Sequence, residues 1–441
     1  MTQTQSAPPA TLAAPPQGAA GQAPNARSAG PRGAVAQWFE GTPGRMRAFL
    51  ILAAAMSVVF GLAAAQGFSQ SDGSLERAQA NTAQLVRIQA IHTNLVSANA
   101  DATNAFLVGG LEPPGQRAHF VNSLAAAAGL IADAASAQPA DREVLGALNK
   151  TLVTYEGLIE QARANNRQGL PIGSQYLKDA NSVLQEDSLP LVKALVEANE
   201  QRVDTEFDGI GKGTIWILAG GILSLVIFAI TLRWLARRTH RYLNVPIAAG
   251  AALVLLTTVI GGVALASASG TAKDTRNAEY ERTLALSRAR IAAYDARSNE
   301  SLTLIARGSG DAFDKAYTAA AAEVDNQLGK SSGTTDGLQD AWADYKRVHG
   351  KVREADTSGN WDGAVAMAVG DPKAADNSAK TFGAFDTAST EQLTASSDAV
   401  SSELSDARDG LPPIGWLGVP IGIVAALLVA WGMSQRLEEY R

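Results

Sequence analysis

Four long apolar runs interrupt a chain that is otherwise patterned as amphipathic helices. Each run has about the 20 residues that an α-helix needs to cross the hydrocarbon core of a bilayer. We therefore expect transmembrane helices over residues 45–68, 212–235, 246–268 and 411–434. The same pattern predicts an all-α protein, in which the regions between the runs are bundles of amphipathic helices.

The loop between the second and third runs sets the expected orientation in the membrane. Residues 236–245 are basic and contain no Asp or Glu. Short loops rich in Arg and Lys stay on the cytoplasmic side. The protein is therefore expected to cross a membrane several times, with both termini and this loop inside. Arginines in or beside the loop are candidate cytoplasmic output residues: Arg233, Arg237, Arg238 and Arg241.

The region at 69–211 begins with a long heptad of mixed polarity. From Ser74 onward, apolar and polar residues recur at three-and-four spacing: Leu75, Ala78, Thr82, Leu85, Gln89, His92, Val96, Asn99, Thr103 and Phe106. Three further helices are expected near 115–137, 140–165 and 174–209, with a kink at Pro190. The breaks between them contain glycine or proline: Gly109 and Gly110, Pro113 and Pro114, Pro139, Gly169, Pro171 and Gly173. Four helices joined by short turns predict an extracytoplasmic up-down four-helix bundle.

The region at 269–410 repeats this plan and predicts a second bundle in tandem. Its first helix carries another heptad: Tyr280, Leu284, Ser287, Ile291, Tyr294, Ser298, Ser301 and Ile305. Four residue pairs match at one offset of 190: Tyr155 with Tyr345, Arg163 with Arg353, Gly169 with Gly359, and Gly173 with Gly363. Agreement at a single offset within equivalent hairpins favours a duplication.

Composition narrows the possible functions. Residues 1–44 are rich in Pro, Ala, Gly and Gln, so a disordered cytoplasmic tail is expected there, with a short second tail at 435–441. The net charge of the whole chain is −6, and the regions outside the basic segments are more acidic still, which argues against nucleic acid as a partner. The absence of Cys excludes disulfides, thiolate nucleophiles and Cys-based metal sites.

No pattern in the sequence points to catalysis, so neither enzyme activity nor a cofactor is expected. None of the four histidines has a second His or a Cys at ligand spacing. The segment from Gly211 to Thr214 lacks the upstream glycine and the Lys-Ser/Thr pair of a phosphate-binding loop. In the last apolar run, Gly418 and Gly422 form a GxxxG pair that allows close helix packing.

Polar residues are expected to gather where the helix hairpins of each bundle turn, far from the membrane. As a hypothesis these form a partner-binding surface: Asp101, Asn104, Arg163, Asn166, Asp295, Arg297, Glu300, Arg353 and Asp356. The alternative is ordinary helix capping and ion pairing at helix ends.

The whole chain resembles the actinobacterial tandem four-helix-bundle membrane sensors of the GlnX type. The segments that carry this resemblance are DATNAFLVGG, ARANNRQGLPIG, DARSNESLTLIARG and READTSGNWDG. The individual bundles also resemble the sensor modules of bacterial chemoreceptors. The resemblance implies a bacterial plasma-membrane location and signal transduction, with an extracytoplasmic amino-acid-binding lipoprotein of the GlnH type as input and a cytosolic Ser/Thr kinase of the PknG type as output.

Other functions remain open at this point. The chain is also compatible with an envelope scaffold, with an accessory protein of a transporter, and with a sensor whose bundles bind a small ligand directly. A homo-oligomer is possible in each case. The apolar runs contain no central ionisable residue, which argues against a transport path through them.

Overall fold

The computed structural model describes residues 41–108, 111–239, 244–331, 336–370 and 376–438. Throughout these ranges the regular structure is helical and contains no strand, so the prediction of an all-α protein is confirmed. Of the tails expected at 1–44 and 435–441, residues 1–40 and 439–441 lie outside the described residues, as do the loop residues 240–243. Residues 41–44 and 435–438 are helical instead, as the start of α2 and the end of α14.

The helices follow one another with short connections. The first half of the chain contains α2 (Gly41–Val108), α3 (Pro114–Ala137), η1 (Pro139–Asp141), α4 (Arg142–Arg167), α5 (Ile172–Ser182), η2 (Val183–Ser188), α6 (Leu189–Ile210) and α7 (Lys212–Thr239). The second half contains α8 (Val245–Thr275), η3 (Arg276–Tyr280), α9 (Glu281–Ile305), α10 (Asp311–Lys330), α11 (Asp336–Thr357), α12 (Trp361–Val369), α13 (Ser378–Asp409) and α14 (Ile414–Glu438).

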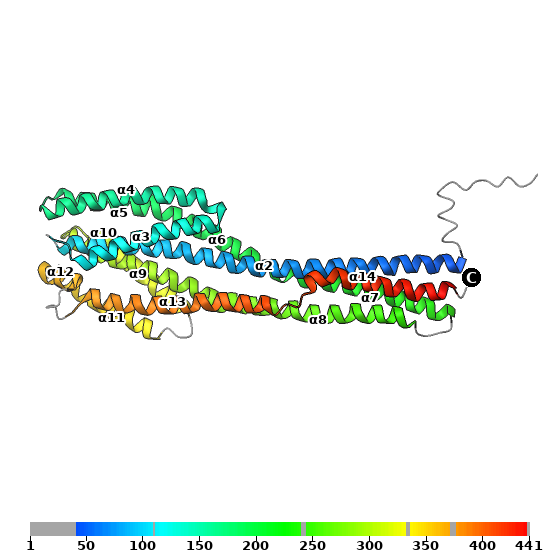
Figure 1. Cartoon of the computed structure of the whole chain (residues 1–441). Helices are drawn as coiled ribbons and strands as arrows, with labels where there is room; N and C mark the ends of the chain where they lie inside the picture. Colours follow the sequence, from blue (N-terminus) through cyan, green and yellow to red (C-terminus); the bar gives the residue numbers. More distant parts are fainter. Residues whose placement is uncertain (1–40, 109–110, 240–243, 332–335, 371–375, 439–441) are drawn as a thin grey trace, which may run out of the picture.

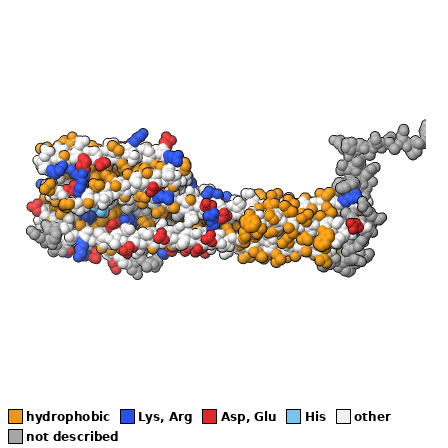
Figure 2. Space-filling view, viewed as in Figure 1, with side chains coloured by type: hydrophobic (Ala, Val, Ile, Leu, Met, Phe, Trp, Pro, Cys, Tyr) orange, Lys and Arg blue, Asp and Glu red, His pale blue; other side chains and the backbone are white. Residues whose placement is uncertain are grey.

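The molecule is elongated, with a broad head at one end and a narrow rod at the other (Figure 1). Helix α2 runs through both parts without interruption. Its 68 residues correspond to about 100 Å at 1.5 Å per residue. On the face shown in Figure 2, hydrophobic side chains cover the rod, whereas charged side chains are scattered over the head among hydrophobic and other ones.

The rod consists of α7, α8, α14 and the first part of α2. Its core residues come from all four helices and include Phe60, Phe228, Val254 and Val429. Large apolar side chains also cover its outer surface; Leu62 and Leu427, for example, are more than half exposed. Five helical stretches among the described residues are long and apolar enough to cross a membrane, and four of them include a helix of the rod. These stretches are consistent with a membrane protein.

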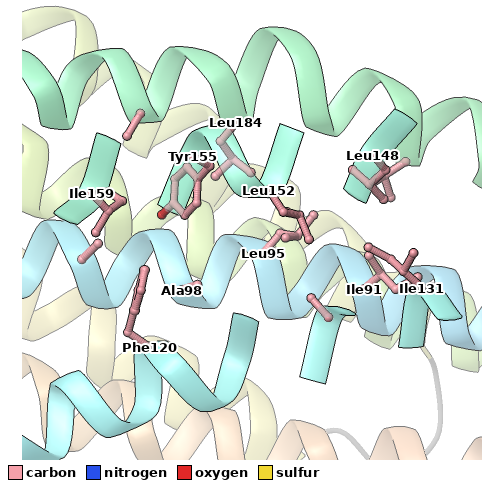
Figure 3. Packing of buried hydrophobic residues seen from close by; sticks show 14 of the residues in the cluster. Ile91, Leu95, Ala98, Phe120, Ile131, Leu148, Leu152, Tyr155, Ile159 and Leu184 are labelled. Carbon is pink, nitrogen blue, oxygen red and sulfur yellow. The ribbon is translucent and has the colours of Figure 1, made fainter. Parts of the chain in front are cut away.

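The fifth apolar stretch, α3, lies in the head and packs into the first bundle. Its length and alanine content satisfy the criteria for a span, but its buried residues face other helices of the bundle. Phe120 and Ile131 of α3 belong to a core that also contains Ile91 and Leu95 of α2 and Tyr155 of α4 (Figure 3).

Two glycines of α14 bring that helix into backbone contact with α2. A Cβ atom placed on Gly422 would lie 2.6 Å from the carbonyl oxygen of Ser57 and 2.8 Å from the Cα of Gly61. One placed on Gly418 would lie 2.8 Å from the carbonyl oxygen of Gly61. The GxxxG pair thus serves the close packing expected of it, and it joins the first half of the chain to the second.

The returning helix of the first bundle contains a π-helical segment, η2, immediately before Pro190. A proline inside a helix removes a hydrogen bond and its ring clashes with the carbonyl four residues earlier. Widening the preceding turn into a π-helix is one way to accommodate this, and such turns often occur at functional sites. The structure thus places a widened turn at Val183–Ser188, and the kink expected at Pro190 stays a prediction.

The two bundles of the head lie side by side along α2 and α9. The core of the second bundle includes Val96 and Ala100 of α2. The polar heptads of the two halves face one another, and the Asn99 Nδ2 donates a hydrogen bond of 2.9 Å to Ser298 Oγ. This explains why the first heptad is so polar: the core of the first bundle uses a neighbouring stripe of α2 that includes Ile91 and Leu95.

Below the head, the two halves share one core. The cluster contains Leu75 of α2, Phe207 of α6, Ala272 of α8 and Leu404 of α13. Ion pairs between the halves surround this stalk: Arg408 with Asp72 at 2.8 Å and with Glu76 at 3.0 Å, and Arg276 with Asp204 at 2.6 Å and with Asp208 at 3.2 Å. Head, stalk and rod are thus connected by continuous or nearly continuous helices.

Candidate functional site

The hairpin turns at the far end of the head have the same backbone structure in both halves. After α4, the amides of Gly169 and Leu170 donate to the carbonyls of Asn166 and Asn165. After α11, the amides 190 positions later, of Gly359 and Asn360, donate to the carbonyls of Asp356 and Ala355. Both glycines have positive φ, 67° and 87°, which only glycine adopts without strain. The equivalence inferred from the matching residues is confirmed for these turns.

Arg163 is held inside the first tip by two carboxylates. Its guanidinium lies 3.0 Å from Glu112 and 2.9 Å from Glu160, and its Cζ lies 4.0 Å from the centre of the Phe120 ring. Only 10% of the side chain is exposed. These contacts tie the end of α4 to the start of α3, so Arg163 has a structural role in addition to any role in recognition.

The other predicted residues of the first tip also contact neighbouring helices. The Asn166 Nδ2 donates to the carbonyl of Phe106 and so closes the end of α2 against α4. Asp101 lies 2.5 Å from His119 Nδ1, and this hydrogen bond raises the pKa of His119. Asn104 is buried.

In the second tip an arginine is again held between two carboxylates, which come from different residues. Arg353 lies 2.9 Å from Asp314 and 2.6 Å from Asp356. Beside this pair, the Arg307 guanidinium stacks on the Trp361 ring at 3.9 Å. Arg307 has a φ of 39°, an unusual value for a residue with a side chain. In both halves the duplicated arginine therefore binds two carboxylates of its own bundle.

Arg297 and Glu300 lie inside the second bundle. Glu300 is 2% exposed and accepts hydrogen bonds from Ser378 Oγ at 2.8 Å and from His349, whose Nδ1 lies at 2.7 Å. Arg297 is 8% exposed and lies over the Phe382 ring at 4.8 Å. A partner would reach these side chains only if the helices separated. The predicted distal group thus divides into a tip set and a buried set, and its use by a partner stays a prediction.

Asp295 lies apart from both sets, at the interface of the two halves. Its carboxyl faces a cavity between α9 and the π-helical segment η2, where it is hydrogen-bonded to Gln185. Burial raises the pKa of Asp295 to about 7. The sequence pattern indicated a polar heptad on this face but gave no sign of a cavity.

The first tip also exposes apolar side chains that sequence reasoning missed. Leu111 is 84% exposed, and Val108, Leu170 and Ile172 at the same end are 37%, 44% and 49% exposed. Leu111 shares a hollow of about 300 Å³ with Arg163 and Arg167. Exposed apolar groups rimmed by charges are typical of surfaces that bind another protein. They went unnoticed because a few apolar residues in turns have no periodic signal.

The opposite end of the molecule carries the candidate output arginines. Arg233, Arg237 and Arg238 are exposed at the end of α7, at the far end of the rod from the head. Arg241 lies outside the described residues. Within the described ranges, no three His, Cys, Asp or Glu side chains gather in a way that would hold a metal ion.

Comparison with known protein families gives a match to the first bundle. Residues 74–208 match the family of the actinobacterial sensor domain, a range that covers the extramembrane part of α2 through most of α6. No curated protein and no solved structure matches the chain. Residues 74–208 are therefore similar to an actinobacterial sensor domain, and this match supports a role in sensing and signalling.

Proposed function

We propose that this protein relays the availability of amino acids outside the cell to a cytosolic Ser/Thr kinase, and that it reads the signal through a solute-binding lipoprotein. The identity of both partners follows from the resemblance to sensors of the GlnX type. The observation that carries the relay is mechanical: helices from both bundles continue through one stalk into the rod. Packed helices that slide or rotate transmit small displacements over such distances.

In this proposal the head lies outside the membrane and both ends of the chain lie inside. The arginines near the start of α2 and the end of α7 support this orientation, because basic flanks stay on the cytoplasmic side. Reporter fusions test it. Alkaline phosphatase fused at Gln138 should be active and at Thr239 inactive; the reverse pattern would contradict the orientation.

The first tip is the proposed contact for the lipoprotein. Leu111 offers an exposed apolar anchor beside Arg163 and Arg167, and exposed apolar groups rimmed by polar residues mark protein interaction sites. A lipid anchor leaves the lipoprotein free to diffuse along the outer surface of the plasma membrane. Its globular part can therefore approach the head from the side or from the end far from the membrane.

Site-specific photocrosslinking in native membranes tests both partners. A crosslinker at Leu111 should capture a lipid-anchored solute-binding protein, whereas one at Val153, which is 70% exposed on the side of α4, should not. A crosslinker at Arg238 should capture a Ser/Thr kinase. Capture of the same proteins from Val153, or of neither class from the two test positions, would contradict the proposal.

A further inference from the structure

A large cavity lies between the two halves of the head, away from the tips. Its volume is about 670 Å³, within the range of small-molecule sites. The first half contributes residues from α2, η2 and α6, and the second half contributes residues from α9 and α10. A second hollow of about 450 Å³ shares Gln185 and Asp295 with it. Asp295 therefore stands where the two hollows meet.

Two side chains of α2 that line the cavity have unused hydrogen-bonding groups. Gln89 is 1% exposed, and neither its Nε2 nor its Oε1 has a hydrogen-bond partner among the described residues. The Nε2 of His92 likewise has none there. Burial without a partner costs free energy, so native proteins rarely leave such groups unpaired. Both residues line the cavity, so a polar molecule inside it would supply the partners.

Asp295 adds a negative charge without a positive counterpart. In the described part of the chain no Lys, Arg or His side chain forms an ion pair with Asp295. The nearest basic residues of the cavity wall have other partners: Arg288 binds Glu200, and Lys193 lies 3.9 Å from Glu197 with 77% of its side chain exposed. A carboxylate in a poorly hydrated site is stabilised by a cation that enters with a ligand.

We propose that this cavity binds a small molecule with a protonated primary amine, with Asp295 as its counter-ion and with Gln89 and His92 as hydrogen-bonding partners. Burial lowers the pKa of His92 to about 4, so its imidazole is neutral at pH 7 and does not compete for Asp295. The ligand would touch α2 of one half and α9 of the other. Binding would therefore change how the two halves pack, which couples the site to the stalk. The binding itself does not depend on the lipoprotein or the kinase.

The probes distinguish two classes of ligand that carry a protonated amine, namely polyamines and amino acids. Putrescine carries amines alone, whereas L-glutamine carries an amine and a carboxylate; N-acetyl-L-glutamine lacks the free amine and is the negative control. The purified full-length protein in nanodiscs is titrated with each probe by isothermal calorimetry. We expect saturable binding of putrescine or L-glutamine and none of N-acetyl-L-glutamine.

The variants test which residues hold the amine. Asp295→Asn keeps the size of the side chain and should weaken amine binding at least tenfold. Gln89→Leu should weaken amine binding to a smaller extent. Asp133→Asn, on an exposed face of α3, is the matched control and should bind normally. Circular dichroism verifies that each variant folds.

Binding of neither amine, equal binding of the acetylated probe, or unchanged affinity in Asp295→Asn would overturn the proposal. Amine binding by a protein whose crosslinkers at Leu111 and Arg238 capture neither a lipoprotein nor a kinase would leave this site standing and contradict the relay instead.

Discussion

At the scale of single residues, Asp295 is the most unusual group in the head. Its pKa is raised to about 7 by burial, whereas an Asp in an unfolded chain titrates near 3.9. The folded protein therefore holds this proton more tightly than the unfolded chain does. Stability attributable to Asp295 is greatest at low pH and decreases as the pH rises from about 4 to about 7.

This predicts a pH-dependent effect of Asp295→Asn. The variant should gain more stability over the parent at pH 8 than at pH 5, by about 3 kcal/mol in the free energy of unfolding. Thermal unfolding followed by circular dichroism at the two pH values measures the difference. His92, Lys193, Arg288 and Glu323 also face the cavity, but they are present in both proteins. An equal gain at both pH values would mean that Asp295 titrates normally.

Arg163 provides a second prediction at this scale. Arg163→Ala removes the contacts to Glu112, Glu160 and Phe120 and leaves two carboxylates close together, so we expect a loss of about 1–3 kcal/mol. Arg167→Ala, an exposed position in the last turn of the same helix, should change stability by less than about 0.5 kcal/mol. Chemical denaturation of both variants measures this. If Arg163→Ala were as stable as the parent, its ion pairs would be incidental and a role in partner recognition would gain support.

At the scale of helices, much of the fold could be predicted from the sequence. The apolar runs and the Gly and Pro breaks placed most helices within a few residues, because these signals are local. Helix α12 was missed, because nine residues between two glycine-containing breaks carry too little periodicity. The contact of Asn99 with Ser298 was also beyond reach, because a heptad indicates a buried face without naming the helix that covers it.

The candidate site was less predictable than the helices for a related reason. The duplicated turns around Gly169 and Gly359 could be found by comparing the halves, since turn chemistry is local. Whether a charged residue such as Glu300 ends up inside the bundle depends on partners distant in the sequence, here His349 and Ser378. The cavity beside Gln89 and Asp295 depends on how two separate bundles pack, and no local pattern encodes that.

The contact between α2 and α14 gives a prediction at the scale of helices. Gly422→Ala would place a methyl group against the backbone of Ser57 and Gly61, so the two helices must move apart. We expect a loss of about 1–3 kcal/mol, the usual cost of overpacking. Gly270→Ala in α8 has open space around the new methyl group and should be neutral or slightly stabilising. Thermal unfolding in detergent compares them, and equal melting temperatures would show that the helices adjust freely.

At the scale of the whole molecule, the two halves of the chain pack against each other and form one unit. They share the stalk core, exchange the ion pairs of Arg408 and Arg276, and enclose the cavity beside Asp295. A signal that changes the angle between the bundles can therefore pass to the rod within a single chain. Because the halves are linked covalently, this pairing does not depend on protein concentration, unlike that of a homodimer.

This arrangement predicts that a covalent bond across the interface forms within one chain and blocks signalling. The protein has no Cys, so Asn99→Cys with Ser298→Cys introduces a single pair, at side chains that are 2.9 Å apart in the parent. Mild oxidation should link the two tryptic peptides within a monomer, at a yield independent of protein concentration. Val153→Cys with Ser298→Cys is the control and should remain unlinked, because Val153 lies on the exposed side of α4.

If the halves must move to transmit a signal, the linked protein should lose its downstream kinase response and regain it on reduction. A linked protein that still signals would show that the information passes through one half alone.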